Sequence, residues 1–452
     1  MRFLFPMSPL EIRTMTQSSA SNPAAESPKP SRRQFMSHTA AGATAATLAA
    51  SLPFARVAHA QGAGTLKVAL VGCGGRGSGA AAQALTADKG NTLTALCDIF
   101  PDRIEGTLTG LKNEFPKQIA DKVNKYDGFD GYKAAINDCD VVLLATSPHF
   151  RPMMVEEAVK QGKHMFVEKP VGTDVVNTLR CLEATKKAKE KNLAVVSGLC
   201  YRYQRAKQQT MEQIRNGAIG KIRAMYTYYY TTELWHRGNK PEWSEMEYQI
   251  RNWLYFTWLS GDHIVEQHIH SIDKCAWANG DKTPKAAVAI GGRSKRTGKE
   301  YGNIYDNFYV SFEYDDGVVL HSTCRQMNGT TADISDYVVG EKGTANLQSH
   351  FIKDNDGKLA WRCPRIPNDN MYQNEHDDFF KSIRDGKPIN NGDYMAQSTL
   401  MAILGREAAY TGQKITWEQL LASKQDLSPK GGYKWGPNPV EPVAVPGVTK
   451  WV

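Results

Sequence analysis

The sequence has 452 residues, and 55 Lys and Arg stand against 47 Asp and Glu, which gives a formal net charge of +8. Hydrophobic residues make up 41% and charged residues 23%, which excludes a chain that is disordered throughout or a disulfide-stabilised miniprotein. The length predicts about two to three domains. The positive charge favours an anionic partner only if the basic residues cluster.

The first sixty residues have the features of an export signal. Arg32-Arg33-Gln34-Phe35 precedes a stretch at 39–52 of mostly Ala, Gly and Thr. The small-x-small sequence Ala58-His59-Ala60 is typical of a cleavage site. Residues 1–60 therefore resemble a twin-arginine (Tat) signal, so we expect cleavage after Ala60 and export through the Tat translocase to the periplasm or otherwise out of the cytoplasm.

A disordered basic leader and a membrane anchor are the alternatives for this segment. Its apolar run is shorter than the roughly 20 residues that span a bilayer, so no stable membrane anchor is predicted. Without residues 1–60, which hold six basic and two acidic residues, 49 basic residues stand against 45 acidic ones, a net charge of +4. No Lys or Arg cluster remains that would follow phosphates, so no nucleic acid partner is expected.

The eight cysteines give no sign of a metal site. None of them forms a C-x-x-C pair, which argues against a zinc ribbon. Cys73, Cys97 and Cys200 lie in apolar runs and are expected to be small core residues. We predict no metal ligands.

Residues 66–200 alternate between predicted strands and helices. Apolar runs predict strands at 67–71, 93–97, 141–145, 164–167 and 193–197, with helices between them at 78–86, 102–115, 152–161 and 175–191. Strands that are apolar throughout and alternate with helices predict an α/β fold with a doubly wound, parallel sheet of the Rossmann type.

Residues 201–420 have a different pattern. Helices are predicted at 206–216, about 261–277, 377–384 and 395–410, and strands at 286–290, 307–313, 318–324, 337–340 and 344–348. This predicts an α+β domain with an antiparallel sheet. Residues 421–452 are rich in proline and are expected to form an extended arm.

A glycine-rich turn follows the first predicted strand. Gly72, Gly74 and Gly77 form G-x-G-x-x-G between an apolar strand and a small-residue helix, which is the context of a dinucleotide-binding loop. Gly75 and Arg76 belong to the same loop. Its glycines allow a tight turn, close approach of a pyrophosphate and close helix packing. The alternative is a tight turn that binds nothing.

An acidic residue completes this fingerprint. Asp98 ends the next strand, 21 residues after Gly77. A carboxylate at this place accepts hydrogen bonds from both ribose hydroxyls and repels a 2′-phosphate. Because Ile99 and Phe100 offer no basic group, NAD is favoured over NADP as the cofactor.

Two further strand ends extend the predicted cofactor site. The loop after strand 141–145, on the nicotinamide side, consists of Thr146, Ser147, Pro148 and His149. For His149 an ordinary surface-loop position is the alternative. Glu168-Lys169-Pro170 closes strand 164–167, at the sheet edge where ligands of α/β proteins bind. Lys169 can there polarise or deprotonate a substrate hydroxyl, although periodicity alone favours a surface lysine.

These motifs resemble the Gfo/Idh/MocA family of oxidoreductases. The resemblance covers about residues 66–420 and rests on the glycine loop, Asp98, Glu168-Lys169-Pro170, and the segments at 216–222, 339–344 and 411–412. It implies a Rossmann domain followed by a domain, at 201–420, with an open, mainly antiparallel sheet that would bind substrate and form oligomers. It also implies NAD(P)-dependent oxidation or reduction of sugars and polyols, in a homo-oligomer.

The resemblance implies three catalytic residues. His270 matches the family histidine, which takes or gives the hydroxyl proton, and Lys169 is the second member. Glu266 stands four residues before His270, where the family has an aspartate that orients the histidine from the same helix. The longer side chain leaves open whether Glu266 orients His270 or is itself an acid/base. Metal binding is the alternative for these histidines, but the H-E-x-x-H motif is absent.

Five residues are candidate substrate contacts. Arg151 stands where the family often has histidine, and it either pairs with an acidic substrate or caps the following helix. The other candidates are Tyr201, Arg202, Trp235 and His236. The aromatic residues between 226 and 258 are otherwise expected to pack in the core or at a subunit interface.

Export constrains the predicted activity, because no ready NAD pool exists outside the cytoplasm. We therefore expect an oxidoreductase with tightly bound cofactor, acting on a hydroxyl or ketone of a sugar or sugar derivative. One alternative is an NAD-dependent glycosidase that uses transient oxidation and elimination. Another is a sugar- or dinucleotide-binding protein without catalysis.

Overall fold

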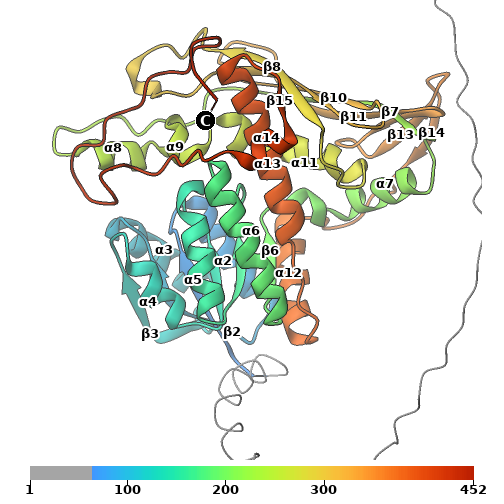
Figure 1. Ribbon diagram of the computed structural model, residues 1–452. Coiled ribbons are helices and arrows are strands. Elements are labelled where there is room, and N and C mark those ends of the chain that lie inside the picture. Colours follow the sequence, from blue (N-terminus) through green and yellow to red (C-terminus); the bar gives the residue numbers. More distant parts are fainter. Residues whose placement is uncertain (1–63, 452) are drawn as a thin grey trace, which may run out of the picture. The chain divides into compact units, whose positions relative to one another are not determined.

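The computed structural model describes residues 64–451. The predicted Tat segment and its cleavage position lie outside the described residues. The described chain contains two β-sheets, which Figure 1 shows below and above one another with α13 beside both.

The first sheet has six strands in the order β3-β2-β1-β4-β5-β6, and every neighbouring pair is parallel. The strands are β1 (Leu66–Val71), β2 (Asn91–Cys97), β3 (Ile119–Tyr126), β4 (Val141–Leu144), β5 (His164–Val167) and β6 (Val195–Ser197). The predicted doubly wound parallel sheet is confirmed. The edge strand β3 was not predicted, because none of its residues is buried and it has no apolar run.

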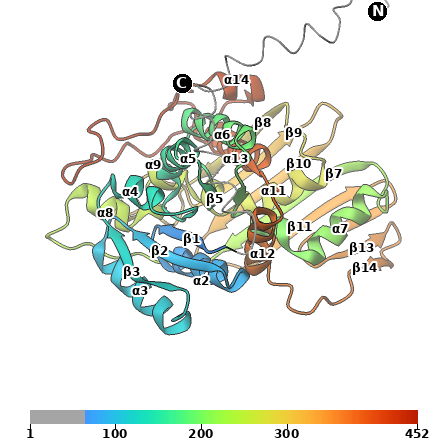
Figure 2. The ribbon, with the colours of Figure 1, turned by 90° about the horizontal axis from the view of Figure 1, so that it is seen from below.

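Helices cover both faces of this sheet. Val68 and Leu70 of β1 pack into one core, and Ala69 and Val71 pack into the other. The first core contains residues of α2 (Gly75–Ala87) and α3 (Pro101–Glu114), and the second contains residues of α4 (Gly131–Asn137), α5 (Arg151–Lys160) and α6 (Val175–Glu190). Figure 2 shows α2 on one side of the strands and α5 and α6 on the other.

A late segment of the chain returns to this sheet. α12 (Met371–Arg384) packs against α2, and its Phe379 and Phe380 belong to the same core as Leu85. Val195 N in β6 donates to Ile389 O (2.8 Å). α12 and the segment after it thus pack with the first predicted domain, although they lie in the range 201–420.

The second sheet has nine strands in the order β14-β13-β12-β11-β7-β10-β9-β8-β15. β7 and β10 are parallel and all other neighbours are antiparallel, which confirms the mainly antiparallel sheet. The strands are β7 (Ile222–Thr231), β8 (Ala286–Gly292), β9 (Asn307–Glu313), β10 (Val319–Gln326), β11 (Asp333–Gly340), β12 (Gly343–Asn346), β13 (Phe351–Asp354), β14 (Leu359–Arg362) and β15 (Ile415–Thr416).

One face of this sheet is covered and the other is open. α11 (Ile269–Ala278) packs on β7 and β11, and α13 (Gly392–Thr411) packs on β8 and β9. Along β8, Ala287 and Ala289 are buried, whereas Val288 is 42% and Ile290 is 70% exposed. The strand period of two residues places Val288 and Ile290 on the uncovered face.

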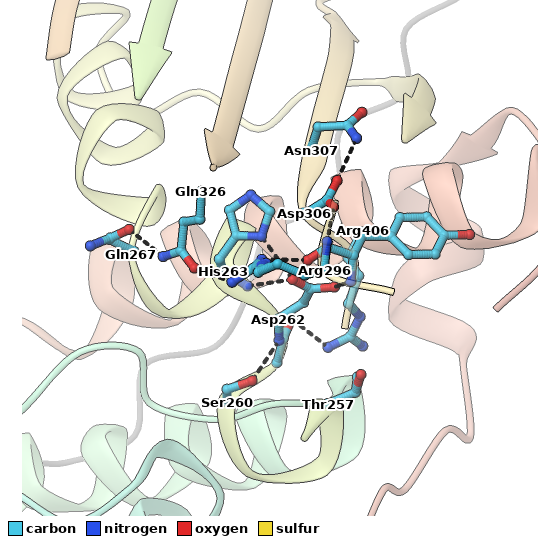
Figure 3. Close-up of polar contacts among 12 residues, drawn as sticks. Thr257, Ser260, Asp262, His263, Gln267, Arg296, Asp306, Asn307, Gln326 and Arg406 are labelled. Atoms are coloured by element: carbon cyan, nitrogen blue, oxygen red, sulfur yellow. Dashed lines mark hydrogen bonds and ion pairs between the residues drawn. The ribbon is translucent and has the colours of Figure 1, made fainter. Parts of the chain in front are cut away.

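The helix predicted at about 261–277 is two helices. α10 (His263–Glu266) is separated from α11 by Gln267 and His268. Asp262 precedes α10 with a φ of +73°, and its Oδ1 accepts a hydrogen bond from His263 N (2.5 Å). Figure 3 shows Asp262 at the centre of a polar network. Glu266 and His270 consequently lie on different helices, which corrects the prediction of one shared helix.

The C-terminal arm lies over its own chain. It begins at Ser423, after α14 (Trp417–Ala422), and residues 423–451 contain no helix or strand. Tyr433 stacks on Phe129, and Trp435 stacks on Phe100, each with ring centroids 6.0 Å apart. Within residues 64–451, no helix is both long and apolar enough to cross a bilayer.

Candidate functional site

A cavity of about 810 Å³ lies at the carboxyl ends of β1, β2, β4 and β5. The residues that follow these four strands line it together with Trp235, Glu266 and His270 of the second region. Parallel sheets bind ligands at this edge. The cavity therefore contains the predicted dinucleotide loop and the predicted catalytic residues.

The glycine loop between β1 and α2 has no room for side chains at two positions. Gly72 has a φ of +100°, and a Cβ there would lie 2.6 Å from the main-chain carbon of Ala145. A Cβ on Gly77 would lie 1.8 Å from the Gly72 oxygen. α2 begins directly after Gly74, so that its first N–H groups border the cavity. A helix N-terminus of this kind fits a pyrophosphate.

Asp98 is fixed against the glycine loop. Its Oδ2 accepts a hydrogen bond from Cys73 N (2.7 Å), and its Oδ1 accepts one from Phe100 N (2.9 Å). Burial raises the pKa of Asp98, while the hydrogen bond from Phe100 N and the charge of Arg103 act in the opposite direction. The carboxyl group lines the cavity beside the loop, where an adenosine ribose fits.

The loop after β4 contributes only its first half to the cavity. Thr146 and Ser147 line it, whereas Pro148 and His149 do not. His149 is 2% exposed, its Nε2 lies 2.8 Å from the Tyr433 hydroxyl, and burial lowers the pKa of His149 to about 4. The structure places His149 in the core, which corrects both the cofactor contact and the surface-loop alternative.

Arg76 in the glycine loop is bound to two carboxyl groups. Its Nε pairs with Glu168, and its Nη2 lies 2.9 Å from Glu375 Oε1. Burial tends to raise the pKa of Glu168, but Arg76 and Arg151 hold it below the ordinary value. Arg76 and Glu168 both line the cavity, and their ion pair neutralises both charges.

Lys169 joins the two regions of the molecule at the cavity. Its main-chain N donates to Glu168 Oε2 (3.0 Å), and its Nζ donates to the main-chain oxygen of Glu266. The ammonium group thereby lies next to the segment that carries His270.

His270 presents an uncharged imidazole to the cavity. Its ring packs edge-on against Tyr201, with centroids 5.1 Å apart, and among the described residues its Nδ1 has no hydrogen-bond partner. Burial lowers the pKa of His270 well below the ordinary value, and the charges of Lys169 and Lys274 lower it further. A neutral imidazole can accept a proton, although its Nδ1 is itself buried.

Glu266 is separate from His270. Within residues 64–451 no hydrogen bond joins the two side chains, and Glu266 Oε1 has no partner. Burial raises the pKa of Glu266, while Lys169 and Arg296 lower it. No group of three or more His, Cys, Asp or Glu in the described part of the chain is arranged to hold a metal ion.

Two predicted substrate contacts line the cavity. Trp235 is 37% exposed and stands at the cavity with Arg237, whose guanidinium lies 4.5 Å over the indole ring. Arg151 is buried at the start of α5, and its guanidinium donates to the carbonyls of Thr146 and Pro170. Arg151 therefore holds the two cavity loops together.

Three predicted substrate contacts lie outside the cavity. Arg202 is buried in ion pairs with Asp273 (2.8 Å) and Asp281 (2.6 Å), which is a structural role. The ring nitrogen of His236 contacts a main-chain oxygen, and the Tyr201 ring packs edge-on against His270. The structure does not bring these three side chains to the cavity.

The cavity also contains residues that the sequence did not indicate, namely Phe100, Arg103, Arg251, Trp253 and Tyr372. The Arg251 guanidinium lies 3.8 Å over the Phe100 ring, and that of Arg103 lies 5.0 Å from it. Arg103 could have been found from its place in the first turn of the helix after Asp98. Arg251, in α8 (Glu245–Arg251), and Tyr372 come from distant segments that carry no local motif.

Two family models match the chain. The model of the oxidoreductase family with an NAD-binding Rossmann fold, GFO_IDH_MocA, matches residues 66–198. The GFO/IDH/MocA C-terminal domain matches residues 208–346. The first match contains the glycine loop and Lys169, and the second contains Glu266 and His270.

Curated relatives are distant. The chain is 26% identical to 2,7-anhydro-N-acetylneuraminate hydratase of Escherichia coli over 39% of this chain and 43% of that protein. It is 26% identical to inositol 2-dehydrogenase 3 of Saccharopolyspora erythraea over 63% and 73%, respectively. It is 25% identical to a glycosyl hydrolase family 109 protein of Solibacter usitatus over 42% and 43%. The chain thus spans less than half the length of two of these relatives.

Solved structures share the fold. The myo-inositol 2-dehydrogenase of Lactobacillus plantarum superposes with a TM-score of 0.59 at 20% identity, over 78% of this chain and 99% of that one. GenD2 from gentamicin A biosynthesis, in complex with NAD, gives 0.59 at 18% identity over 78% and 96%. Since both domains match models of one family in chain order, the chain belongs to the Gfo/Idh/MocA family of NAD-binding oxidoreductases.

Proposed function

We propose that this protein is an exported NAD-dependent oxidoreductase that acts on a hydroxyl or ketone carbon of a sugar or sugar derivative. The observation that carries the proposal is the convergence of Lys169, Glu266 and His270 on the cavity that contains the glycine loop and Asp98. The relatives named as an inositol dehydrogenase and as a hydratase of a sugar derivative support this substrate class.

Different residues of the cavity would bind the cofactor, polarise the substrate and transfer the proton. The N-terminus of α2 would hold the pyrophosphate and Asp98 the adenosine ribose of NAD, which supplies the acceptor or donor of hydride when bound. Lys169 would polarise the substrate oxygen through its ammonium group. The neutral imidazole of His270 would take the hydroxyl proton during oxidation and return it during reduction.

The choice of NAD over NADP is part of this proposal. The Asp98 carboxyl group disfavours a 2′-phosphate, whereas Arg103 stands near enough to lower the pKa of Asp98 and could bind one. We expect NAD to bind at least about 10-fold more tightly than NADP, and Asp98→Ala to narrow this ratio. Titration of the protein with each dinucleotide, followed by tryptophan fluorescence, measures the two affinities.

Retention of the cofactor is supported by the C-terminal arm. Phe100 and Phe129 line the cavity, and Trp435 and Tyr433 of the arm pack on them from outside. An enzyme that works away from a nicotinamide pool needs a cofactor that stays bound and returns to its starting state within each turnover. Export itself rests on the Tat-like segment and is tested by the location and the N-terminus of the protein in its natural host.

The open face of the second sheet supports a homo-oligomer. Ile290 and Val288 leave apolar surface on this face, and such a patch marks an interface in many proteins. The solution mass of the protein, compared with that of an Ile290→Lys variant, tests this.

The test of the proposed activity starts from purified protein that carries its own nucleotide. Addition of inositol, other polyols and sugars should produce the near-ultraviolet band of reduced nicotinamide with an effective substrate. Release of free sugar from a glycoside would instead favour the alternative of an NAD-dependent glycosidase. The relative named as a glycosyl hydrolase family 109 protein supports this alternative. A sugar that binds without being converted, and binds wild type and Lys169→Met equally well, would favour the alternative of a binding protein without catalysis.

A further inference from the structure

The loop after β7 forms one wall of the cavity. Its residues Trp235 and Arg237 line the cavity together with Trp253, which follows α8. Trp235 is 37% exposed, and Arg237 is also an exposed residue. A ligand in the cavity can therefore reach side-chain atoms of this wall that the chain itself leaves uncovered.

This wall begins beside the catalytic residues. Thr231, the last residue of β7, has its hydroxyl 3.5 Å from Gln267 Oε1, and Gln267 directly follows Glu266. The buried Tyr255 holds the loop further along, because its hydroxyl donates to the main-chain oxygen of Trp235 (3.1 Å). The wall thus leaves the second sheet at the segment of Glu266, where a substrate would react.

Arg237 is held in place by its main chain and by stacking. The buried Asn252 accepts a hydrogen bond from Arg237 N (2.7 Å) and donates one to Gly238 O (3.0 Å). The guanidinium lies 4.5 Å over the Trp235 ring, and Trp253 packs edge-on against the same indole, with centroids 6.3 Å apart. A guanidinium over an aromatic ring keeps the N–H groups in its own plane available as donors.

Arg237 differs from the other arginines of the cavity in having no acidic partner. Five arginines line the cavity. Four of them interact with an oxygen or a carboxylate of the chain, namely Arg76, Arg103, Arg151 and Arg251. Within residues 64–451, no carboxylate lies at ion-pair distance from Arg237. Its charge is therefore available to a ligand.

The shape and charge of this wall indicate which ligand it fits. A carboxylate carries one negative charge and two coplanar oxygens, which a single guanidinium binds through two parallel hydrogen bonds. A phosphate group carries about −1.5 to −2 charges at neutral pH, which is more than one arginine neutralises. The pyrophosphate of NAD has its own place at the N-terminus of α2. The indole rings of Trp235 and Trp253 add apolar surface for the C–H groups of a sugar ring.

We propose that Arg237, held over Trp235, binds an ionised carboxylate of the substrate, so that the protein selects sugar acids over neutral sugars. Lys169 and His270 then act on a hydroxyl or ketone carbon elsewhere in the same molecule. This inference rests on the proposed function, because it names the kind of sugar that the same site takes.

Binding of matched acidic and neutral compounds tests the proposal. The pairs are glucuronate with glucose, galacturonate with galactose, and gluconate with sorbitol, each titrated by calorimetry into the full-length protein saturated with NAD. We expect at least one acid to bind about 10-fold or more tightly than its neutral partner, and added salt to reduce this preference. Arg237→Gln should abolish the preference, and Arg237→Lys, which keeps the charge but loses the planar fork, should retain part of it.

Lys240→Gln is the matched control. Lys240 belongs to the same loop, is exposed, does not line the cavity and lies 3.9 Å from Glu242, so this variant removes the same charge outside the site. It should keep the full preference for the acid. The proposal is overturned if no acid binds better than its neutral partner, if Arg237→Gln keeps the preference, or if Arg237→Gln loses its affinity for NAD, which would make Arg237 a cofactor ligand.

The proposed function fails or stands separately. Reduction of bound NAD by a neutral polyol, with no preference for acids, would keep the oxidoreductase and overturn the role of Arg237. An acid that binds through Arg237 but never reduces NAD would keep this role and count against the oxidoreductase.

Discussion

The two ends of the cavity are built in different ways. At the cofactor end the main chain sets the shape, since Gly72 and Gly77 lie against other backbone atoms and Asp98 is held by two N–H groups. At the proton-transfer end, side chains from separate segments meet, and Glu266 Oε1 and His270 Nδ1 have no partners among the described residues. The first end is held by contacts within the chain, whereas the second leaves these two buried atoms without a hydrogen bond.

At the cofactor end, the largest effect is expected from Gly77→Ala. The new Cβ would lie 1.8 Å from the Gly72 oxygen, so the loop must open or the helix must shift. We expect the affinity for NAD to fall by at least about 100-fold, which isothermal titration calorimetry measures.

Gly79→Ala is the matched control on the same helix. Its Cβ would lie 3.7 Å from an Arg76 nitrogen, which is an ordinary contact, and alanine favours the helix. If both variants bind NAD equally well, the shape of the loop is not what creates this end of the cavity.

At the other end, Lys169→Met should separate binding from chemistry. Loss of the ammonium group is expected to slow hydride transfer by about 10²- to 10⁴-fold while NAD still binds, because the glycine loop and Asp98 are untouched. Single-turnover kinetics measures the rate, and Lys160→Met, on an exposed lysine of α5, is the control. A rate unchanged by Lys169→Met would contradict the role of this lysine.

The arm should also affect the cofactor end, but less strongly. A chain that stops at Ser428 lacks Tyr433 and Trp435, so Phe100 and Phe129 lose their stacking partners. We expect NAD to dissociate roughly 10- to 100-fold faster, given about 0.5–1.5 kcal/mol for each aromatic pair. Stopped-flow displacement measures this rate, and a double variant, Tyr433→Ala with Trp435→Ala, should reproduce it. Equal rates of NAD dissociation from wild type and from these variants would contradict a role of the arm in cofactor retention.

The last effect concerns the acid stability of the folded chain around His149. Burial lowers the pKa of His149 to about 4 from 6.5, so the unfolded chain takes up the proton first as the pH falls. The stability associated with neutral His149 is fully present above pH 6.5, is lost progressively toward about pH 4, and amounts to about 3 kcal/mol. Thermal unfolding of His149→Gln should therefore depend less on pH in this window. The same dependence of thermal unfolding on pH in wild type and variant would contradict this prediction.

The comparison also explains how far the sequence could be interpreted. The cofactor end follows from local rules, because a strand, three glycines and an acidic residue suffice to predict it. β3 escaped prediction because it is an exposed edge strand. The helix predicted at 377–384 is part of α12, but its packing on the first sheet escaped prediction, because nothing local ties Phe379 and Phe380 to a sheet more than 170 residues earlier. The spacing of Glu266 and His270 predicted one helical face, but Asp262 starts a short helix that ends between them. His149 and Arg202 were misassigned because burial in tertiary contacts has no local signal.

The spectrum of the purified protein with its own nucleotide tests the central claim most directly. The account predicts that a suitable polyol or sugar converts the bound nucleotide to its reduced form, seen as the near-ultraviolet band of reduced nicotinamide, and that Lys169→Met carries the same nucleotide without this change. A protein that holds no nucleotide after gentle isolation, and binds none when NAD is added, would contradict the account.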